Sequence, residues 1–464
     1  MDEDYRPPAG RGLGLRPHWL NRNLACLFAG RALRSASQAY LVIIVPLYLA
    51  ALGYNAEHLG AMFAVVGGAS ALLSALTGFL SDRFGRKTLV ILLSLMTAAG
   101  GVIFALSANF IVLTAAAAAG TIGRGGGAGS AGAFGPYYPA EQALIAEQAE
   151  DYLRTTVFGA LSFLAVLGGA VGSLIAWAPR LMHTILGLPV IDGYRALFVF
   201  TGLIGLAMAA VVMPVRETHR PAAARIRGAS RSASARARNP GPHTNGEART
   251  IQDVAGADGG RLILGLSPRS WRLVARFMVT AATNGLAVGM LGPLLVYWFH
   301  RRYGVDAADI GKLYFMLNLL AAAPYLLAGR MAALFGSVRA VVVCRGIASL
   351  LLGVLVLMPS FWLAGLLYGA RMIFNTLSIP VRQSFLMGVI PPAERSSAAG
   401  MASFPAQLGA SISPYVAGYL MEQAALELPL VLAALLQGLN AALYYVFFRE
   451  VRPPEELGDE ERPF

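Results

Sequence analysis

Apolar blocks of about 20 residues recur along the chain and are separated by short polar segments. A helix of about 20 apolar residues spans the hydrocarbon core of a bilayer. Only 13% of the 464 residues are charged and 56% are hydrophobic, whereas soluble domains carry about 25% charged residues. The pattern therefore predicts an all-α polytopic membrane protein and argues against a water-soluble globular domain.

Twelve such blocks fall into two sets of six. The predicted spans are 24–52, 59–80, 88–106, 110–131, 156–177 and 196–213, followed by 271–297, 310–327, 340–357, 361–380, 398–420 and 428–448. We expect a six-helix bundle over 24–213 and another over 271–448, with tails at 1–23 and 449–464. The Arg-rich stretch 214–270 has too few apolar residues to form a core and predicts a disordered linker, either a solvated tether or a contact for anionic lipid headgroups.

The distribution of the arginines between the two sides of the membrane, rather than the net charge of +12, indicates how the chain is oriented. The tails, the linker and the segment between the second and third spans hold most of the Lys and Arg, which places both termini in the cytoplasm of a plasma (inner) membrane protein. The arginines do not form a basic domain of the kind that binds nucleic acid, so nucleic acid is not an expected partner. Cys26 and Cys344 lie inside apolar blocks and predict no disulfide.

The two halves repeat each other. Gly53 and Gly60 recur as Gly304 and Gly311 at an offset of 251 residues, and the same offset maps Gly85 onto Gly336. A second set, which includes Pro139 and Arg154, maps onto Pro380 and Arg395 at an offset of 241. Two related six-helix halves are a transporter architecture.

The segment between the second and third spans is Gly78-Phe-Leu-Ser-Asp-Arg-Phe-Gly-Arg-Lys87, which predicts a tight charged hairpin. It resembles the signature that the major facilitator superfamily carries in this loop, and the six-linker-six organisation extends the resemblance over nearly the whole chain. The resemblance implies two pseudo-symmetric helical bundles around a central cavity, working by alternating access. The second copy has lost its acid, because Ala333 stands where Asp82 stands in the first.

The resemblance also implies a gate. Asp82 would lie against the start of the eleventh helix near Ser396, where unpaired N–H groups favour an anion, and Arg86 would reach Glu141 or Glu147 at the end of the fourth. The alternative is that these charges only set topology. The expected gate and motif residues are Gly78, Asp82, Arg83, Gly85, Arg86, Lys87, Glu141, Glu147 and Arg154.

Several polar residues lie deep within predicted spans. A charge at the bilayer centre costs at least about 2.5 kcal/mol and normally faces a cavity or a partner. Arg31 and Arg34 could instead extend toward lipid headgroups. The expected cavity or substrate residues are Arg31, Arg34, Gln38, Arg124, Tyr138, Asn284, Arg371 and Arg382.

The segment from Gly135 to Gln142 contains two prolines and should break or kink the fourth helix. It holds Glu141, the one carboxylate that we place near the transport path and therefore the candidate proton carrier. Glu141 aligns with Arg382 in the repeat, so the two could meet across the gate. In the fifth helix, Ser173 stands where the family's antiporter motif has a proline, which favours ordinary glycine-mediated packing there.

These features predict a secondary transporter of a small organic solute, with proton-coupled efflux as the leading interpretation. Uptake or facilitated diffusion of a neutral or anionic metabolite is the alternative. A membrane enzyme is disfavoured because the six histidines are scattered and lack metal-ligand spacing, and a sensor would need a signalling domain. No cofactor or metal is expected beyond a proton gradient, and the family suggests a monomer.

Overall fold

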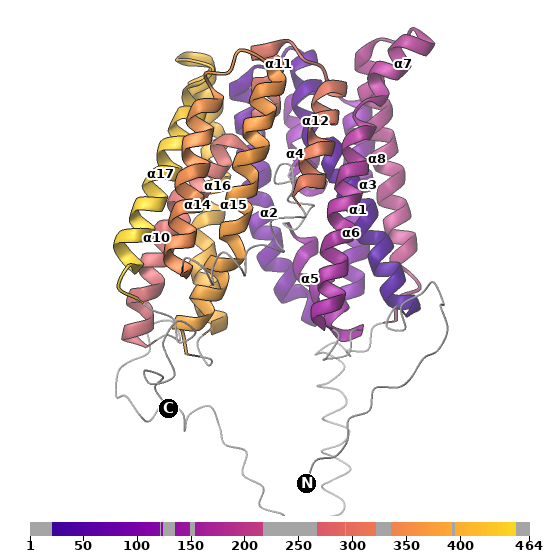
Figure 1. The fold of residues 1–464 in the computed structure, drawn as a ribbon. Helices are drawn as coiled ribbons and strands as arrows, with labels where there is room; N and C mark the ends of the chain where they lie inside the picture. The colour runs from indigo at the N-terminus through magenta and orange to yellow at the C-terminus, as the bar shows by residue number, and fades with distance from the viewer. Residues whose placement is uncertain are drawn as a thin grey trace, which may run out of the picture.

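A computed structural model describes residues 21–120, 122–123, 135–148, 154–216, 267–292, 294–321, 336–391 and 395–451. These residues form helices in two groups that stand side by side (Figure 1). The first group is α1 (Arg22–Ala51), α2 (Ala56–Phe84), α3 (Arg86–Leu106), α4 (Phe110–Gly120), α5 (Tyr137–Gln148), α6 (Arg154–Ile175), α7 (Ala178–Leu186) and α8 (Val190–Val212). The second is α10 (Pro268–Leu291), α11 (Leu295–Tyr303), α12 (Ala307–Leu320), α14 (Ser337–Leu355), α15 (Phe361–Val389), α16 (Arg395–Gln423) and α17 (Leu428–Phe448).

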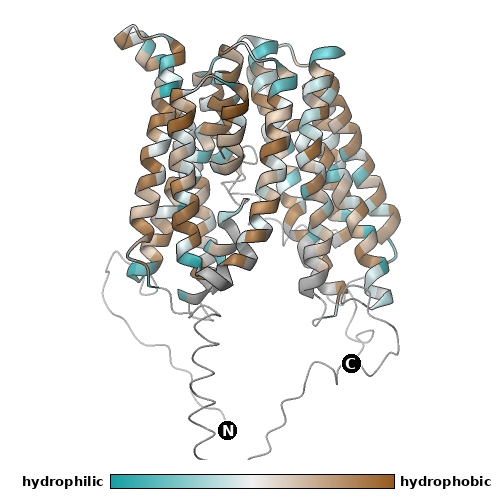
Figure 2. Ribbon diagram, turned by 180° about the vertical axis from the view of Figure 1, so that it is seen from behind, coloured by the Kyte–Doolittle hydropathy of each residue, from teal (hydrophilic) through white to brown (hydrophobic). Residues whose placement is uncertain are grey.

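Hydrophobic residues predominate along the helices (Figure 2). Large aliphatic side chains such as Leu72, Leu106 and Leu366 are 63%, 83% and 70% exposed. Among the described residues, eight helical segments are long and apolar enough to cross a membrane. The tenth and eleventh predicted spans correspond to α15 and α16, each of 29 residues. The protein is an all-helical polytopic membrane protein.

We call the end of the molecule where α1 begins and α17 ends the terminal end, and the opposite end, which carries α7 and α11, the far end (Figure 1). Two predicted boundaries are wrong at the far end. The sixth span begins at Val190 instead of residue 196, and the short helix α7 precedes it. The seventh span is one membrane-spanning segment that extends to Tyr303 instead of residue 297, with α10 ending at Leu291 and α11 beginning at Leu295.

The charged segment after the second span is tighter than the hairpin that its composition predicts. Helix α2 continues through Phe84, and α3 begins at Arg86. Gly85 alone turns the chain, with φ of 93°, a left-handed conformation that favours glycine. Asp82 and Arg83 therefore belong to the last turn of a helix, not to a loop.

The sequence repeat is visible in the backbone. Gly53 and Gly304 each follow a helix and have φ of 89° and 66°. Gly85 and Gly336 each precede a helix and have φ of 93° and 75°. These two pairs are separated by the same 251 residues, so the equivalent turns of the two halves use the same conformation.

The halves meet through α2 and α16 and through α6 and α12. A side chain on Gly311 of α12 would come within 2.7 Å of the Ser173 carbonyl of α6, and one on Gly67 of α2 within 2.9 Å of the Ser411 Cα of α16. Asn318 of α12 donates to the Ser173 hydroxyl at 3.1 Å. Ser173 thus supports packing between the halves, where the antiporter motif would place a proline.

Candidate functional site

A buried ionic cluster joins α1 to α5 in the N-terminal half. Arg31 Nη1 and Arg34 Nη2 of α1 lie 2.9 and 2.7 Å from the same carboxylate oxygen, Oε2 of Glu141 on α5. The three residues are 4%, 5% and 6% exposed. One acid therefore faces two guanidinium groups in a site that water barely reaches.

The predicted break in the fourth span builds this cluster. Helix α4 ends at Gly120, and Gly123 and Gly135 have φ of 80° and 105°. Helix α5 starts at Tyr137, directly after Pro136, so that Pro139 falls in its first turn, where a missing N–H costs nothing. Because residues four apart share a helix face, Tyr137 and Glu141 point to the same side of α5.

Tyr137 contacts both the ionic cluster and the neighbouring helix α3. The Arg34 guanidinium carbon lies 4.9 Å from the centre of the Tyr137 ring, a cation–π distance. The Tyr137 hydroxyl is 3.0 Å from the Thr97 hydroxyl of α3, which also lies 3.0 Å from the Gly120 carbonyl at the end of α4. Arg34, Tyr137 and Thr97 thus connect the ion pairs to both sides of the broken span.

The alternative that Arg31 and Arg34 extend to lipid headgroups is wrong, because both are buried and paired with Glu141. Among the described residues, the Glu141 carboxylate pairs with these two arginines of α1 and not with Arg86 or Arg382. A contact of Glu141 with Arg86 or Arg382 in a state with the gate closed stays a prediction. A contact between Arg86 and Glu147 stays a prediction, since the Glu147 side chain lies outside the described residues.

The C-terminal half contains a second buried polar cluster, which the sequence reasoning missed. Arg345 of α14 is 2% exposed, its Nη1 donates to the Asn440 side-chain oxygen, and its Nε lies 3.4 Å from the Ser378 hydroxyl. Asn440 in turn donates to the Thr283 hydroxyl at 2.9 Å. The one available signal was an arginine inside an apolar block.

The other predicted cavity residues are distributed along the spans. Arg371 is 5% exposed and lies 5.6 Å from the Tyr368 ring centre, and Gln38 is 9% exposed. Asn284 and Arg382 are partly buried. Arg124 lies outside the described residues. Gly78, Asp82, Arg83, Tyr138 and Arg154 are in helices, but the side chains of the last four lie outside the described residues.

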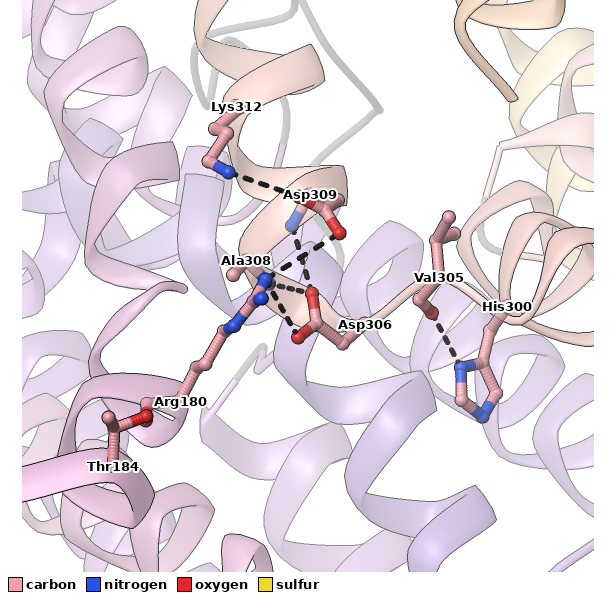
Figure 3. A network of polar contacts seen from close by, with 8 residues as sticks. All are labelled: Arg180, Thr184, His300, Val305, Asp306, Ala308, Asp309 and Lys312. Carbon is pink, nitrogen blue, oxygen red and sulfur yellow. Dashed lines mark hydrogen bonds and ion pairs between the residues drawn. The ribbon is translucent and has the colours of Figure 1, made fainter. Parts of the chain in front are cut away.

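An exposed network bridges the halves at the far end (Figure 3). Arg180 of α7 lies 3.4 Å from Asp306 and 3.7 Å from Asp309 at the start of α12, and Lys312 lies 3.1 Å from Asp309. Asp306 also caps α12 through the backbone N–H groups of Ala308 and Asp309. On the opposite side of the interface, the Ala56 N–H donates to Glu422 at 3.3 Å.

A family model decides the class of protein. The model described as "Major Facilitator Superfamily" matches residues 27–370 and 277–463. The chain belongs to the major facilitator superfamily. Proteins of this family are transporters and not enzymes, and they act on small molecules within a lipid bilayer. No group of acidic, histidine and cysteine residues able to hold a metal occurs among the residues that the structure describes.

Individual relatives are distant. The chain is 21% identical over 406 residues to the uncharacterized membrane protein YJR124C of Saccharomyces cerevisiae, covering 86% of this chain and 88% of the yeast protein. A bacterial homolog of the human lysosomal transporter Spinster, in an inward-facing and unoccupied conformation, superposes with a TM-score of 0.68 at 14% identity, covering 94% of this chain and 98% of that one. The xylose transporter XylE of E. coli, in its inward-open conformation, gives 0.62 at 15% identity, covering 94% and 98%. At these identities the structures establish the fold of the superfamily alone.

Proposed function

We propose that this major facilitator protein is a proton-coupled carrier that exports a small organic solute, with Glu141 as its proton-binding residue. The observation that carries the proposal is the Arg31–Glu141–Arg34 cluster. Glu141 is the one acidic side chain among the buried residues of the described structure. A buried ionisable residue within a membrane protein is typical of proton relays.

Protonation would change the cluster in a defined way. A neutral carboxyl group no longer balances the charges of Arg31 and Arg34, which lie within 2.9 Å of it. Removing one partner from a buried ion pair costs about 3–5 kcal/mol. Proton binding is therefore expected to favour a conformation in which α1 and α5 separate or the arginines find another partner. That link is what proton-coupled alternating access requires.

The contacts between the halves support an inward-facing state. Ser173 lies near the end of α6, Arg180 contacts the start of α12, and the Ala56 N–H that donates to Glu422 lies at the start of α2, all toward the far end. We propose that the terminal end faces the cytoplasm of the plasma membrane, because the Arg-rich tails and linker of the sequence continue from α1, α8, α10 and α17 at that end, where Gly85 also turns the chain. The far-end contacts would then form the closed outer gate.

The test uses purified protein in proteoliposomes with an imposed pH gradient and a panel of labelled organic solutes. The expected result is uphill flux of at least one solute that collapses when the gradient is removed. The Glu141→Gln variant should lose uphill flux but keep gradient-independent exchange, since the carrier can still change conformation without a proton. Glu57→Gln at the far end of α2 is the matched control and should behave as wild type.

Uphill, gradient-driven flux that persists in Glu141→Gln would overturn the assignment of the proton site. The direction is tested in the same vesicles: an acidic interior should drive accumulation if the protein exchanges solute for protons. Accumulation with the opposite gradient would identify an uptake carrier instead.

A further inference from the structure

The cluster around Arg345 in the C-terminal half has a property that the Glu141 cluster lacks. We propose that Arg345 and Arg382, with groups of α17, form a binding site for an oxyanion of the phosphate or carboxylate type. The site is separate from Glu141 and does not depend on proton coupling.

No acid of the C-terminal half can neutralise these arginines from within the membrane. The sequence contains no Asp or Glu between Asp258 and Asp306, between Asp309 and Glu394, or between Glu394 and Glu422. Arg345 sits eight residues into α14, about 12 Å from its start at 1.5 Å per residue. Its partners Asn440 and Ser378 are neutral. The guanidinium is thus hydrogen-bonded, but its charge is not balanced.

A second cation aggravates the imbalance. Arg382 of α15 lies one turn beyond Ser378, and its charge acts directly on Arg345. It makes no hydrogen bond or ion pair with any residue in the described part of the chain. Like charges in a poorly solvated environment repel each other, and each also loses favourable hydration. An anion between the two would remove both penalties.

Helix α17 adds donors without partners. Gln437, Asn440 and Tyr444 follow one face of the helix at spacings of three and four residues. Gln437 and Tyr444 are 0% exposed, and neither the Gln437 amide nor the Tyr444 hydroxyl has a hydrogen-bond partner among the described residues. Tyr444 also lies within electrostatic range of both arginines. Buried polar groups are almost always satisfied, so these atoms indicate a missing ligand.

The chemistry selects the ligand class. A planar guanidinium binds carboxylate or phosphate through two parallel N–H groups, and a tyrosine hydroxyl or an amide N–H can donate to a remaining oxygen. The Asn440 side-chain oxygen is already directed at Arg345, and its amide donates to α10, which fixes the arginine in place. Arg382 is partly exposed, so one of the two guanidinium groups is accessible from outside the cluster. A cation would meet two positive charges and no carboxylate.

The probes are inorganic phosphate and acetate, added to the purified full-length protein in detergent. The thermal melting temperature is measured against sodium chloride at equal ionic strength, and apparent affinities are taken from the concentration dependence. We expect both oxyanions to raise the melting temperature of the wild type beyond the chloride control. Arg382→Gln should weaken the apparent affinity at least tenfold, and Arg345→Gln should abolish the response.

Arg272→Gln is the control variant, because Arg272 is an exposed arginine of α10 and should leave the response unchanged. Since Arg345→Gln could lose folded protein, Arg382→Gln and Tyr444→Phe keep the proposal testable. Equal melting shifts in the wild type and in Arg382→Gln and Tyr444→Phe would overturn it, as would a wild type that responds no more to phosphate and acetate than to chloride. The cluster would then be a purely structural network.

The source of the anion is distinguished in vesicles. Exchange of labelled phosphate or acetate across proteoliposomes, lost in Arg382→Gln, would identify the oxyanion as cargo or as part of the cargo. Binding without exchange would identify a resident ion. A loss of the melting response leaves Glu141-dependent proton coupling intact, so failure of this site and failure of the proposed proton site give different results.

Discussion

Two buried arginine clusters, one in each half, solve the same electrostatic problem differently. In the N-terminal half, Arg31 and Arg34 share the carboxylate of Glu141 at 2.9 and 2.7 Å. In the C-terminal half, Arg345 has only neutral partners, and Arg382 has none among the described residues. Since each guanidinium carries the same charge, the difference lies in what balances it: a residue of the protein in one half and, by our proposal, a ligand in the other.

The difference suggests that the two clusters have different roles in transport. A carboxylate that is part of the chain can gain or lose a proton but cannot leave, whereas a bound anion can leave with its charge. A pseudo-symmetric protein that pairs one fixed acid with one exchangeable anion could therefore couple a proton in the first half to a solute in the second. The following predictions test whether the two clusters are as different as their contacts indicate.

The largest effect is expected from Glu141→Leu. This change leaves two buried guanidinium groups without a counter-charge, which costs about 3–5 kcal/mol. The melting temperature of the purified protein should fall by several degrees. A melting temperature equal to that of the wild type would mean that Arg31 and Arg34 do not depend on Glu141.

A rescue experiment sharpens that result. The triple variant Arg31→Met, Arg34→Met, Glu141→Leu removes all three charges, and replacing a buried ionic triad by apolar residues is often neutral or stabilising. It should recover most of the lost melting temperature while remaining inactive in gradient-driven transport. If the triple variant is as unstable as Glu141→Leu, packing rather than charge explains the loss.

Sequence reasoning anticipated the parts of the molecule that depend on local composition. Blocks of apolar residues located the helices, and the two prolines after Gly135 located the break before α5. It could not pair Glu141 with Arg31 and Arg34, which lie 110 and 107 residues away along the chain. Spacing within one helix is fixed by the helix itself, whereas contacts between helices depend on packing angles that composition does not record.

The turn at Gly85 is a second feature whose exact geometry the composition did not predict. Four charges within six residues predicted a tight charged hairpin, but only Gly85 lies outside the two helices. Backbone hydrogen bonds favour helix up to the membrane surface, and a glycine with positive φ reverses the chain in one step. Arg345 was missed for a related reason, because one arginine within an apolar block does not reveal that Asn440 and Ser378 will meet it.

A smaller effect is expected from Arg345→Met, which, unlike Glu141→Leu, should not lower the melting temperature. In buffer without oxyanions, this change removes an unbalanced buried charge but leaves the Asn440 oxygen without its donor, which costs about 1–3 kcal/mol. Because the two terms offset each other, the melting temperature should stay equal to that of the wild type or rise. A fall as large as that of Glu141→Leu would show that Arg345 is balanced within the protein, and the contrast between the halves would disappear.

The smallest effect is expected from Arg180→Ala at the far end, where the same kinds of charge are exposed to water. Arg180 and Asp306 side chains are 51% and 45% exposed, and exposed ion pairs contribute about 0.2–1 kcal/mol. The melting temperature should therefore barely change.

The distance between spin labels on Thr184 of α7 and Arg301 of α11 should nevertheless shift toward longer values, because we propose that the Arg180 contacts help to hold the far end closed. The labels are introduced in a background with Cys26 and Cys344 replaced by alanine. High salt should produce a similar shift in the wild-type pair by screening the charges, and an unchanged distance in Arg180→Ala would show that helix packing between α6 and α12 alone keeps this end shut.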